Sequence, residues 1–291
     1  MTDCVPQDGE LQLRFEKYKE ILRELTLMSD IFMRNVLKKK ECTEYVLQVI
    51  MEQVNLKIMD QIIQKDYKNL QGRSAILDCV ARDMERKQFN IEVQQENDGA
   101  TPKRARYHSG LLDMNTLEAG QKFDELSETY VILITREDVL NGELPIYHIE
   151  RTINENGERF GDGTHIIYVN AEIQDDTELG KLMHDFHCKK AGEMYSSILA
   201  SRVRELKETP KGVGFMCKEM DQIYQEGILK GREAGMQAGM QAGMEVGEVK
   251  KAKETVILLL EMGLPIDKIA QAVNYSVQKV QEWIAESMNL A

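Results

Sequence analysis

Apolar residues recur at helical spacing through the first part of the chain. From Leu11 to about Gln64 they stand three or four positions apart, as Leu22, Leu25 and Met28 do. This period places them on one side of an α-helix, where they can pack against a core. We therefore expect helices over residues 11–64.

The pattern changes to short strand-like runs between Ser74 and Gln94. Two apolar runs, AILDCVA and FNIEVQ, are separated by the charged segment RDMERK, which is typical of a hairpin. Two further runs, YVILIT and HIIYVN, occupy residues 130–135 and 165–170, and an amphipathic segment at residues 111–126 precedes them. Strands mixed with helices on this spacing predict the α/β class, with a mixed sheet flanked by helices.

Glycine recurs at every fourth position from Gly227 to Gly247, after a helical stretch that begins at Glu178. A helical glycine costs about 1 kcal/mol relative to alanine, so a lone helix here would be marginal. Small residues four apart also let two helices approach closely, although charges such as Arg232 and Glu245 exclude a bilayer setting. Two interpretations stay open: a self-association helix that makes a homo-oligomer, and a flexible tether with residual helicity.

Three short helices are expected at the C-terminal end. The first ends at Gly263, the second begins at Pro265 and the third covers residues 276–287, with glycine and proline where helices usually stop and start. The pattern resembles a helix-turn-helix, but Lys279 is the only cation of its last helix, which is poor for reading a DNA groove. A small packing or interaction module is the alternative.

The composition is that of a folded globular protein, with 42% hydrophobic and 30% charged residues. The formal net charge of -12 argues against coating nucleic acid by charge alone, because duplex affinity comes mainly from neutralised phosphates. Any DNA contact must therefore be local. The five cysteines are scattered without a C-x-x-C pair, and no apolar run is long enough to span a membrane. We expect a cytoplasmic protein without a membrane partner.

The hairpin brings two acids together. If it is centred near Glu85, residue i faces residue 170 minus i, so Asp78 faces Glu92 and Ile76 faces Gln94. Directly opposed residues share one sheet face, and opposed like charges are destabilising unless a cation neutralises them. Magnesium, or manganese in its place, would activate water there for phosphodiester hydrolysis. An edge hairpin with two solvated acids is the alternative that spacing alone leaves open.

Several short motifs also occur in a characteristic order. A helical segment beginning Ser29-Asp30-x-Phe32 is followed by Arg73-x-x-x-Leu77-Asp78, Asn90-Ile91-Glu92-Val93-Gln94 and Arg104-Ala105-Arg106-Tyr107. The segments at residues 120–126 and 182–186 and the glycine tail continue the series. From about Leu27 to the C-terminus, the chain resembles the PD-(D/E)xK nuclease family transposases, also called recombination-promoting nucleases.

The resemblance implies a restriction-endonuclease-like core, which we expect in residues 1–205. The glycine pattern and the C-terminal helices add a helical segment in residues 206–253 and a helix-turn-helix-like module in residues 254–291. The resemblance also implies magnesium-dependent cleavage of DNA during transposition or recombination. Asp78 matches the metal-binding aspartate and Glu92 the acid of the (D/E)xK element.

Gln94 stands where many nucleases of the wider fold have lysine. Glutamine can hydrogen-bond to water or phosphate but adds no charge. A nuclease-fold scaffold that binds DNA or protein, with weak or absent catalysis, is therefore the alternative function.

Other charged residues could complete such a site. An acid on the first helix often does so, and we expect Asp30 rather than Glu44, although Asp30 also suits a helix start. Lys103, Arg104 and Arg106 form a basic stretch that suits contacts to DNA phosphates. A charged, solvated loop is the plain alternative for this stretch.

His184, His187 and Cys188 are spaced to share one helix face, and all three residue types can bind zinc. No fourth ligand is apparent nearby in the sequence. We expect an ordinary helix with a buried cysteine here.

Overall fold

The computed structural model describes residues 9–67, 75–117 and 120–288. Arg73, one of the motif residues, therefore lies outside the described residues. The chain divides into two compact units, Met1–Asp221 and Gln222–Ala291. The division falls within helix α7 (Pro210–Glu261).

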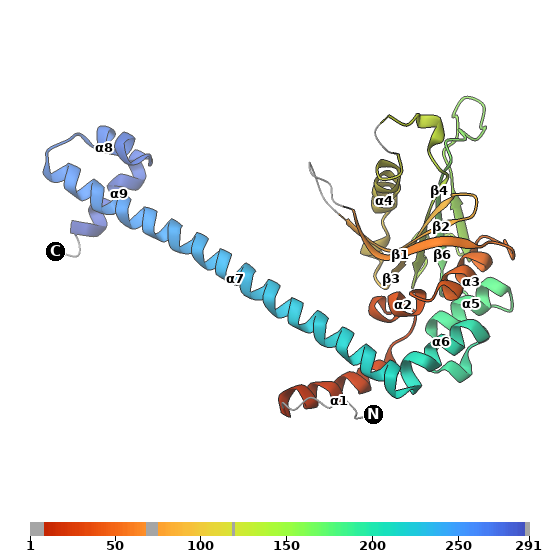
Figure 1. The fold of residues 1–291 in the computed structure, drawn as a ribbon. Helices are drawn as coiled ribbons and strands as arrows, with labels where there is room; N and C mark the ends of the chain where they lie inside the picture. Colours follow the sequence, from red (N-terminus) through yellow and green to blue (C-terminus); the bar gives the residue numbers. More distant parts are fainter. Residues whose placement is uncertain (1–8, 68–74, 118–119, 289–291) are drawn as a thin grey trace. The chain divides into compact units, whose positions relative to one another are not determined.

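A six-stranded mixed sheet forms the centre of the first unit, in the order β1-β2-β3-β4-β6-β5 (Figure 1). Its strands are β1 (Ile58–Tyr67), β2 (Ala75–Asp83), β3 (Gln88–Gln94), β4 (Thr129–Thr135), β5 (Ile146–Ile149) and β6 (Thr164–Asn170). The pairs β1–β2, β2–β3 and β5–β6 are antiparallel, whereas β3–β4 and β4–β6 are parallel. The predicted α/β fold, a restriction-endonuclease-like mixed sheet flanked by helices, is confirmed.

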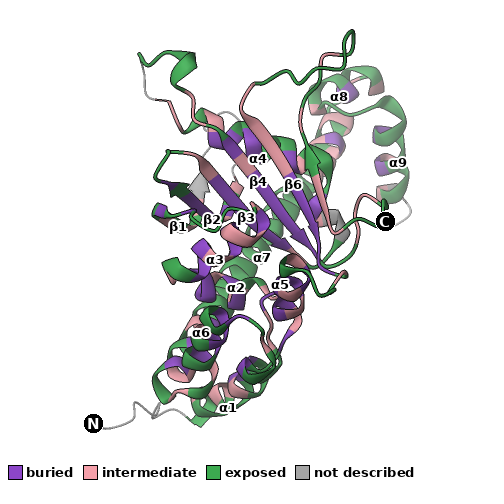
Figure 2. Ribbon diagram, turned by 90° about the vertical axis from the view of Figure 1, so that its right-hand side faces the viewer, coloured by how far each residue is buried: buried purple, intermediate pink, exposed green. Residues whose placement is uncertain are grey.

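Helices cover both faces of this sheet. Helix α4 (Pro102–Met114) packs on β4 and β6, and α2 (Asp30–Leu37) and α3 (Lys40–Ile50) pack on the opposite face (Figure 1). Helices α1 (Gly9–Glu24), α5 (Glu178–His187) and α6 (Ser197–Glu208) extend this second layer. The central strands are consequently buried on both sides (Figure 2).

The predicted β2–β3 hairpin and its register are confirmed. Cys79 pairs with Ile91 and Val80 with Asn90, so the residue numbers of each pair add to 170 as expected. The turn closes because the Asp83 carboxylate accepts from the backbone N–H groups of Glu85 and Lys87, at 2.9 and 2.8 Å.

The predicted helices of residues 11–64 are confirmed as α1, α2 and α3, but the prediction is wrong for the last part, which forms strand β1. The apolar residues of β1, Ile58, Met59, Ile62 and Ile63, fit helical spacing as well as they fit a strand. A tertiary contact favours the strand, because the Glu44 carboxylate accepts from the backbone N–H of Ile58 at 3.0 Å. Strand β5 has no counterpart in the sequence prediction.

The glycine repeat lies within α7, a continuous helix of 52 residues. Every residue from 222 to 248 is exposed, and a Cβ atom added at any of the six repeated glycines would meet nothing within 4 Å. The repeat is therefore helical, but no contact among the described residues requires its glycines.

The end of α7 packs with α8 (Ile266–Val273) and α9 (Val277–Met288) around Val256, Ile269 and Trp283. Asn274 ends α8 in the left-handed conformation, with φ of 59°, and so makes the tight turn before α9. The second and third of the three short helices predicted here are confirmed as α8 and α9, whereas the first is not a separate helix but the end of α7. No helix within the described ranges is long and apolar enough to cross a membrane.

Candidate active site

A pocket of about 400 Å³ lies where the ends of β2 and β3 meet the start of α2 and of α4. Four of the residues predicted for the site line it, namely Asp30, Asp78, Gln94 and Arg104. Four separate elements, α2, β2, β3 and α4, supply these side chains. The fold thus brings an acid from a helix and an acid from a strand together with an amide and a guanidinium.

Glu92 lies behind this pocket and is almost completely buried, at 1% exposure. Its Oε1 atom accepts from the Asp78 backbone N–H at 3.3 Å and from Asn90 Nδ2 at 2.9 Å. His108 Nδ1 lies 3.5 Å from the same oxygen. Gln94 Nε2 donates to the other oxygen at 3.5 Å. The three donors, from Asp78, Asn90 and Gln94, hold the carboxylate in one orientation beside Asp78.

The carboxyl of Asp78 has a strongly raised pKa. This pKa is raised from 3.8 to about 8, first by burial and then by the carboxylates of Glu92 and Asp30, against the opposing effects of Arg34 and a hydrogen bond from the Val93 N–H. A carboxyl with a raised pKa beside other acids is a recurrent property of functional sites. A divalent cation would lower this pKa again, because it favours the charged form of the carboxyl.

Asp30 lies at the exposed edge of the pocket as the first residue of α2. Its carboxylate pairs with Arg34 Nε at 2.9 Å. The residue before it, Ser29, makes no side-chain hydrogen bond to an amide of α2. The Ser29 hydroxyl instead accepts from the Thr26 N–H at 3.3 Å. Gln95 Nε2 donates to the Met28 carbonyl at 2.9 Å and thereby ties the segment before α2 to the end of β3.

Glu44, the other acid considered on the first helices, does not reach the pocket. It is buried at the start of β1, where it pairs with Lys57 Nζ at 3.2 Å as well as with the Ile58 amide. Its role in the structure is to anchor that strand.

Gln94 is held against Gly99, which lies in a short 3-10 turn, η1 (Asn97–Ala100). A Cβ atom added to Gly99 would lie 2.0 Å from Gln94 Oε1. Only glycine at this position leaves room for the amide beside the acids.

The basic stretch lies in the first turns of α4 rather than in a loop. Thr101 caps the helix by accepting from the Arg104 N–H at 3.3 Å. Arg104 reaches the pocket, while Lys103 and Arg106 are exposed and do not line it. None of the three makes an ion pair with any residue in the described ranges.

The sequence pattern does not single out His108 or Asn90, although both surround Glu92. A signal for each is present: His108 follows Arg104 by one helical turn, and Asn90 precedes Glu92 by two residues on the same strand face. His108 Nδ1 and Asn90 Oδ1 are buried without a hydrogen-bond partner among the described residues. These unpaired atoms lie beside the candidate metal ligand.

The donor set of the pocket fits a hard divalent cation. Asp30, Asp78 and Glu92 offer carboxylate oxygens and Gln94 an amide oxygen, the ligand types preferred by magnesium and manganese. The ligand atoms of these three acids are spaced more widely than 4.8 Å as a group.

Comparison with known proteins identifies the family. The model of the PD-(D/E)XK nuclease family transposases matches residues 34–182, just over half of the chain. The chain belongs to this family. No curated protein and no solved structure matches it. Nucleases of the PD-(D/E)XK family usually use divalent metals, and membership supports a nuclease-type function with DNA as the substrate. The matched segment contains Asp78, Glu92 and Gln94 but begins after Asp30.

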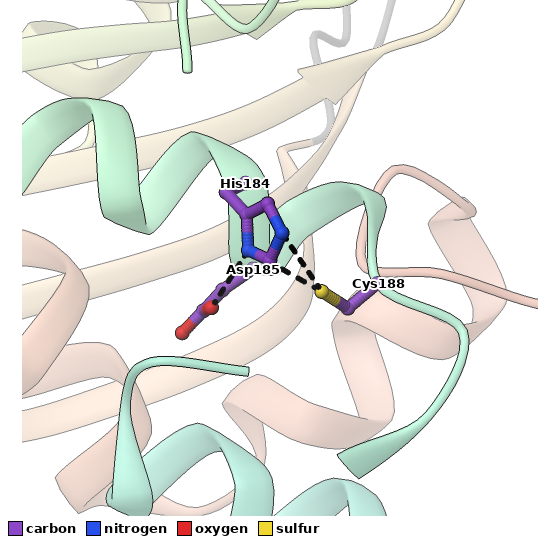
Figure 3. Close-up of side chains that lie close together, drawn as sticks. All are labelled: His184, Asp185 and Cys188. Atoms are coloured by element: carbon purple, nitrogen blue, oxygen red, sulfur yellow. Dashed lines mark hydrogen bonds and ion pairs between the residues drawn. The ribbon is translucent and has the colours of Figure 1, made fainter. Parts of the chain in front are cut away.

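The three-residue cluster considered on α5 is arranged differently from its sequence spacing. His187 Nδ1 lies 2.9 Å from the Met183 carbonyl and 3.2 Å from Gln174 Nε2, away from Cys188. Asp185, and not His187, lies beside His184 and Cys188 (Figure 3).

Proposed function

We propose that this chain is a magnesium-dependent DNA endonuclease that acts in transposition or recombination, with manganese able to replace magnesium. The observation that carries the proposal is the contact between Asp78 and Glu92, in which Glu92 Oε1 accepts from the Asp78 N–H at 3.3 Å, beside a pocket that Asp78 and Arg104 line. Asp78 and Glu92 would hold the cation, and Asp30 would complete its ligands.

A bound divalent cation supplies positive charge that favours loss of a proton from water and offsets the charge that builds on the phosphate. The protein groups have distinct tasks around it. The donors to Glu92 fix the direction of its carboxylate, and Asp78 lies deeper in the pocket than Asp30. Gln94 offers an amide that orients water or a phosphate oxygen by hydrogen bonding.

The basic residues of α4 position the DNA. Arg104, inside the pocket, can make two parallel hydrogen bonds to one phosphate. Lys103 and Arg106 are exposed on the same helix and would contact neighbouring phosphates. Such contacts fix the position of the duplex without reading its sequence.

Plasmid cleavage tests the proposal. The full chain should nick or cut supercoiled plasmid with magnesium or manganese and not with calcium alone or with a chelator. Asp78→Asn and Glu92→Gln should lower the rate by at least about 100-fold, the scale of losing a group that stabilises charge in the transition state.

Glu85→Gln is the matched control, because Glu85 lies in the turn of the same hairpin and its side chain is exposed. It should cleave at the wild-type rate. Magnesium-dependent cleavage that both site variants retain would overturn the assignment of the site. Retention of DNA without cleavage in any divalent metal would instead favour the scaffold function.

We also propose that the chain self-associates through the glycine repeat of α7. A row of exposed methionines, Met236, Met240 and Met244, runs beside the glycines at the same spacing. A second copy of the helix would cover this apolar row, and the glycines would allow the two backbones to approach closely.

A further inference from the structure

A second cluster of metal-ligating side chains lies at the C-terminal end of α5. His184, Asp185 and Cys188 place one ligand atom each within 4.8 Å of the others, the only such group among the described residues. The imidazole ring is linked to both the carboxylate and the sulfur (Figure 3). No metal is assigned to these residues by the proposed nuclease chemistry.

The distances within the cluster suit a tetrahedral metal. Zinc binds sulfur at about 2.3 Å and imidazole nitrogen at about 2.0 Å, so tetrahedral angles put the two ligand atoms about 3.5 Å apart. His184 Nδ1 lies 3.5 Å from Cys188 Sγ and 3.6 Å from Asp185 Oδ1, and His184 Nε2 lies 4.0 Å from the same sulfur. The sulfur therefore faces the imidazole ring, and a turn of this partly exposed ring would bring one nitrogen, the sulfur and the carboxylate around a single ion, with water in the fourth position.

Backbone contacts hold this geometry in place. Asp185 is fully buried, and its two oxygens accept from the Tyr195 and Ser196 N–H groups at 2.7 and 2.8 Å. Cys188 directly follows the last residue of α5, and its Sγ atom lies 3.6 Å from the Glu193 carbonyl oxygen. His184 is partly exposed, which leaves a path for an ion to enter.

A nucleophilic role for Cys188 is disfavoured. Burial and the carboxylates of Asp185 and Glu193 raise the pKa of its thiol to about 11, so it stays protonated at neutral pH. Thiolate and imidazole ligands select zinc or cobalt rather than magnesium.

We propose that His184, Asp185 and Cys188 form a structural site for zinc or a similar soft divalent metal, separate from the nuclease pocket. Binding replaces the Sγ proton of Cys188, which is released to solvent, by a metal–sulfur bond. The metal would fix the side chains at the end of α5, where Asp185 also holds the amides of Tyr195 and Ser196 just before α6.

Cobalt binding to the full chain tests the site. After treatment with chelator and reductant, one equivalent of cobalt should give a thiolate-to-metal charge-transfer band and the visible bands of a tetrahedral complex, and zinc should displace both. Cys188→Ser and His184→Ala should abolish the charge-transfer band and weaken zinc binding more than about 100-fold, since even loss of an outer partner costs about 10–100-fold.

Three controls separate the possible outcomes. His187→Ala should keep the band, because this histidine points elsewhere, and Cys42→Ser should keep it because Cys42 is buried apart from the cluster. Glu92→Gln should also keep it, so the result does not depend on the nuclease site. A wild-type chain that gives no band, or a band that Cys188→Ser retains, would overturn the proposal.

Discussion

Gln94 shows how a single neighbour can decide the position of a functional side chain. Its amide lies between the Glu92 carboxylate and the backbone of Gly99. The lysine common at this position in the wider fold would bring a charge, whereas glutamine acts only by where its amide is held. The contribution of Gln94 therefore depends on Gly99.

We predict that Gly99→Ala lowers the rate of DNA cleavage by up to about 100-fold, because displacement of a positioning group by about 1 Å can cost that much. Stability should change little, since the atom that must move is the far end of a flexible side chain. Single-turnover cleavage rates measured beside melting temperatures check both parts. If the effects of Gly99→Ala and Gln94→Ala multiply in the double variant, the two residues do not act together.

Asp78 links the site to the pH dependence of stability. Its pKa is raised from 3.8 to about 8 in the folded chain, so the folded state holds a proton that the unfolded state has lost. The free energy of unfolding should therefore fall as pH rises from about 4 to about 8 in the absence of metal.

We predict that Asp78→Asn melts higher than the wild-type chain at pH 8 in chelator and that the difference disappears toward pH 4. Each 1 kcal/mol corresponds to about 2–4 °C for a unit of this size. Magnesium should raise the melting temperature of the wild-type chain at pH 8 and leave the variant unchanged. A difference that is the same at both pH values would contradict this origin of the shift.

At the scale of elements, two acids on neighbouring helices have opposite tasks. Glu44 on α3 is buried against the start of β1, and Asp30 at the start of α2 is exposed at the pocket. Glu44 and Asp30 have different roles because α2 and α3 pack in different places, and not because the two side chains differ in chemistry.

We predict that Glu44→Ala lowers the free energy of unfolding by about 1–3 kcal/mol, because the Ile58 amide and Lys57 lose their partner. Cleavage well below the melting temperature should not change. Asp30→Asn should show the reverse, with slower cleavage and nearly unchanged stability. Denaturant unfolding and plasmid assays on both variants test the pair. Loss of metal-dependent cleavage in folded Glu44→Ala would contradict the assignment.

The sequence predicts those elements whose pattern is decided locally. Alternating apolar runs and a charged turn are enough to place β2 and β3 and their register, and with them Asp78 and Glu92. Strand β1 is not predictable in this way, because its isoleucines fit a helix equally well and a distant contact from Glu44 favours the strand. His108 is missed for a similar reason, since its position beside Glu92 depends on how α4 packs across the sheet.

At the scale of the whole molecule, the glycine repeat lowers the stability of the helix that contains it. Each of these glycines costs about 1 kcal/mol relative to alanine, and no neighbour within the chain blocks a Cβ atom. The proposed self-association would explain why glycine, rather than alanine, occupies these positions.

We predict that replacing Gly235, Gly239 and Gly243 by alanine raises the helicity of the chain and shifts it toward the monomer. Circular dichroism and light scattering after size exclusion measure the two effects on the same sample. A chain truncated after Tyr224 should be monomeric. A wild-type chain that is already monomeric would exclude self-association under those conditions, and an alanine variant with an unchanged oligomeric state would exclude close backbone approach.

The place of β3 in the sheet has a consequence for misfolded copies of the chain. It is bonded to β2 on one side and to β4 on the other, both with continuous pairing. A slip of one residue would turn Glu92 into the apolar core and bring Ile91 or Val93 to the metal ligands. Such a chain would lose its core together with its site. Errors of strand pairing should therefore yield unstable chains that cells degrade, rather than stable, inactive copies that compete for DNA.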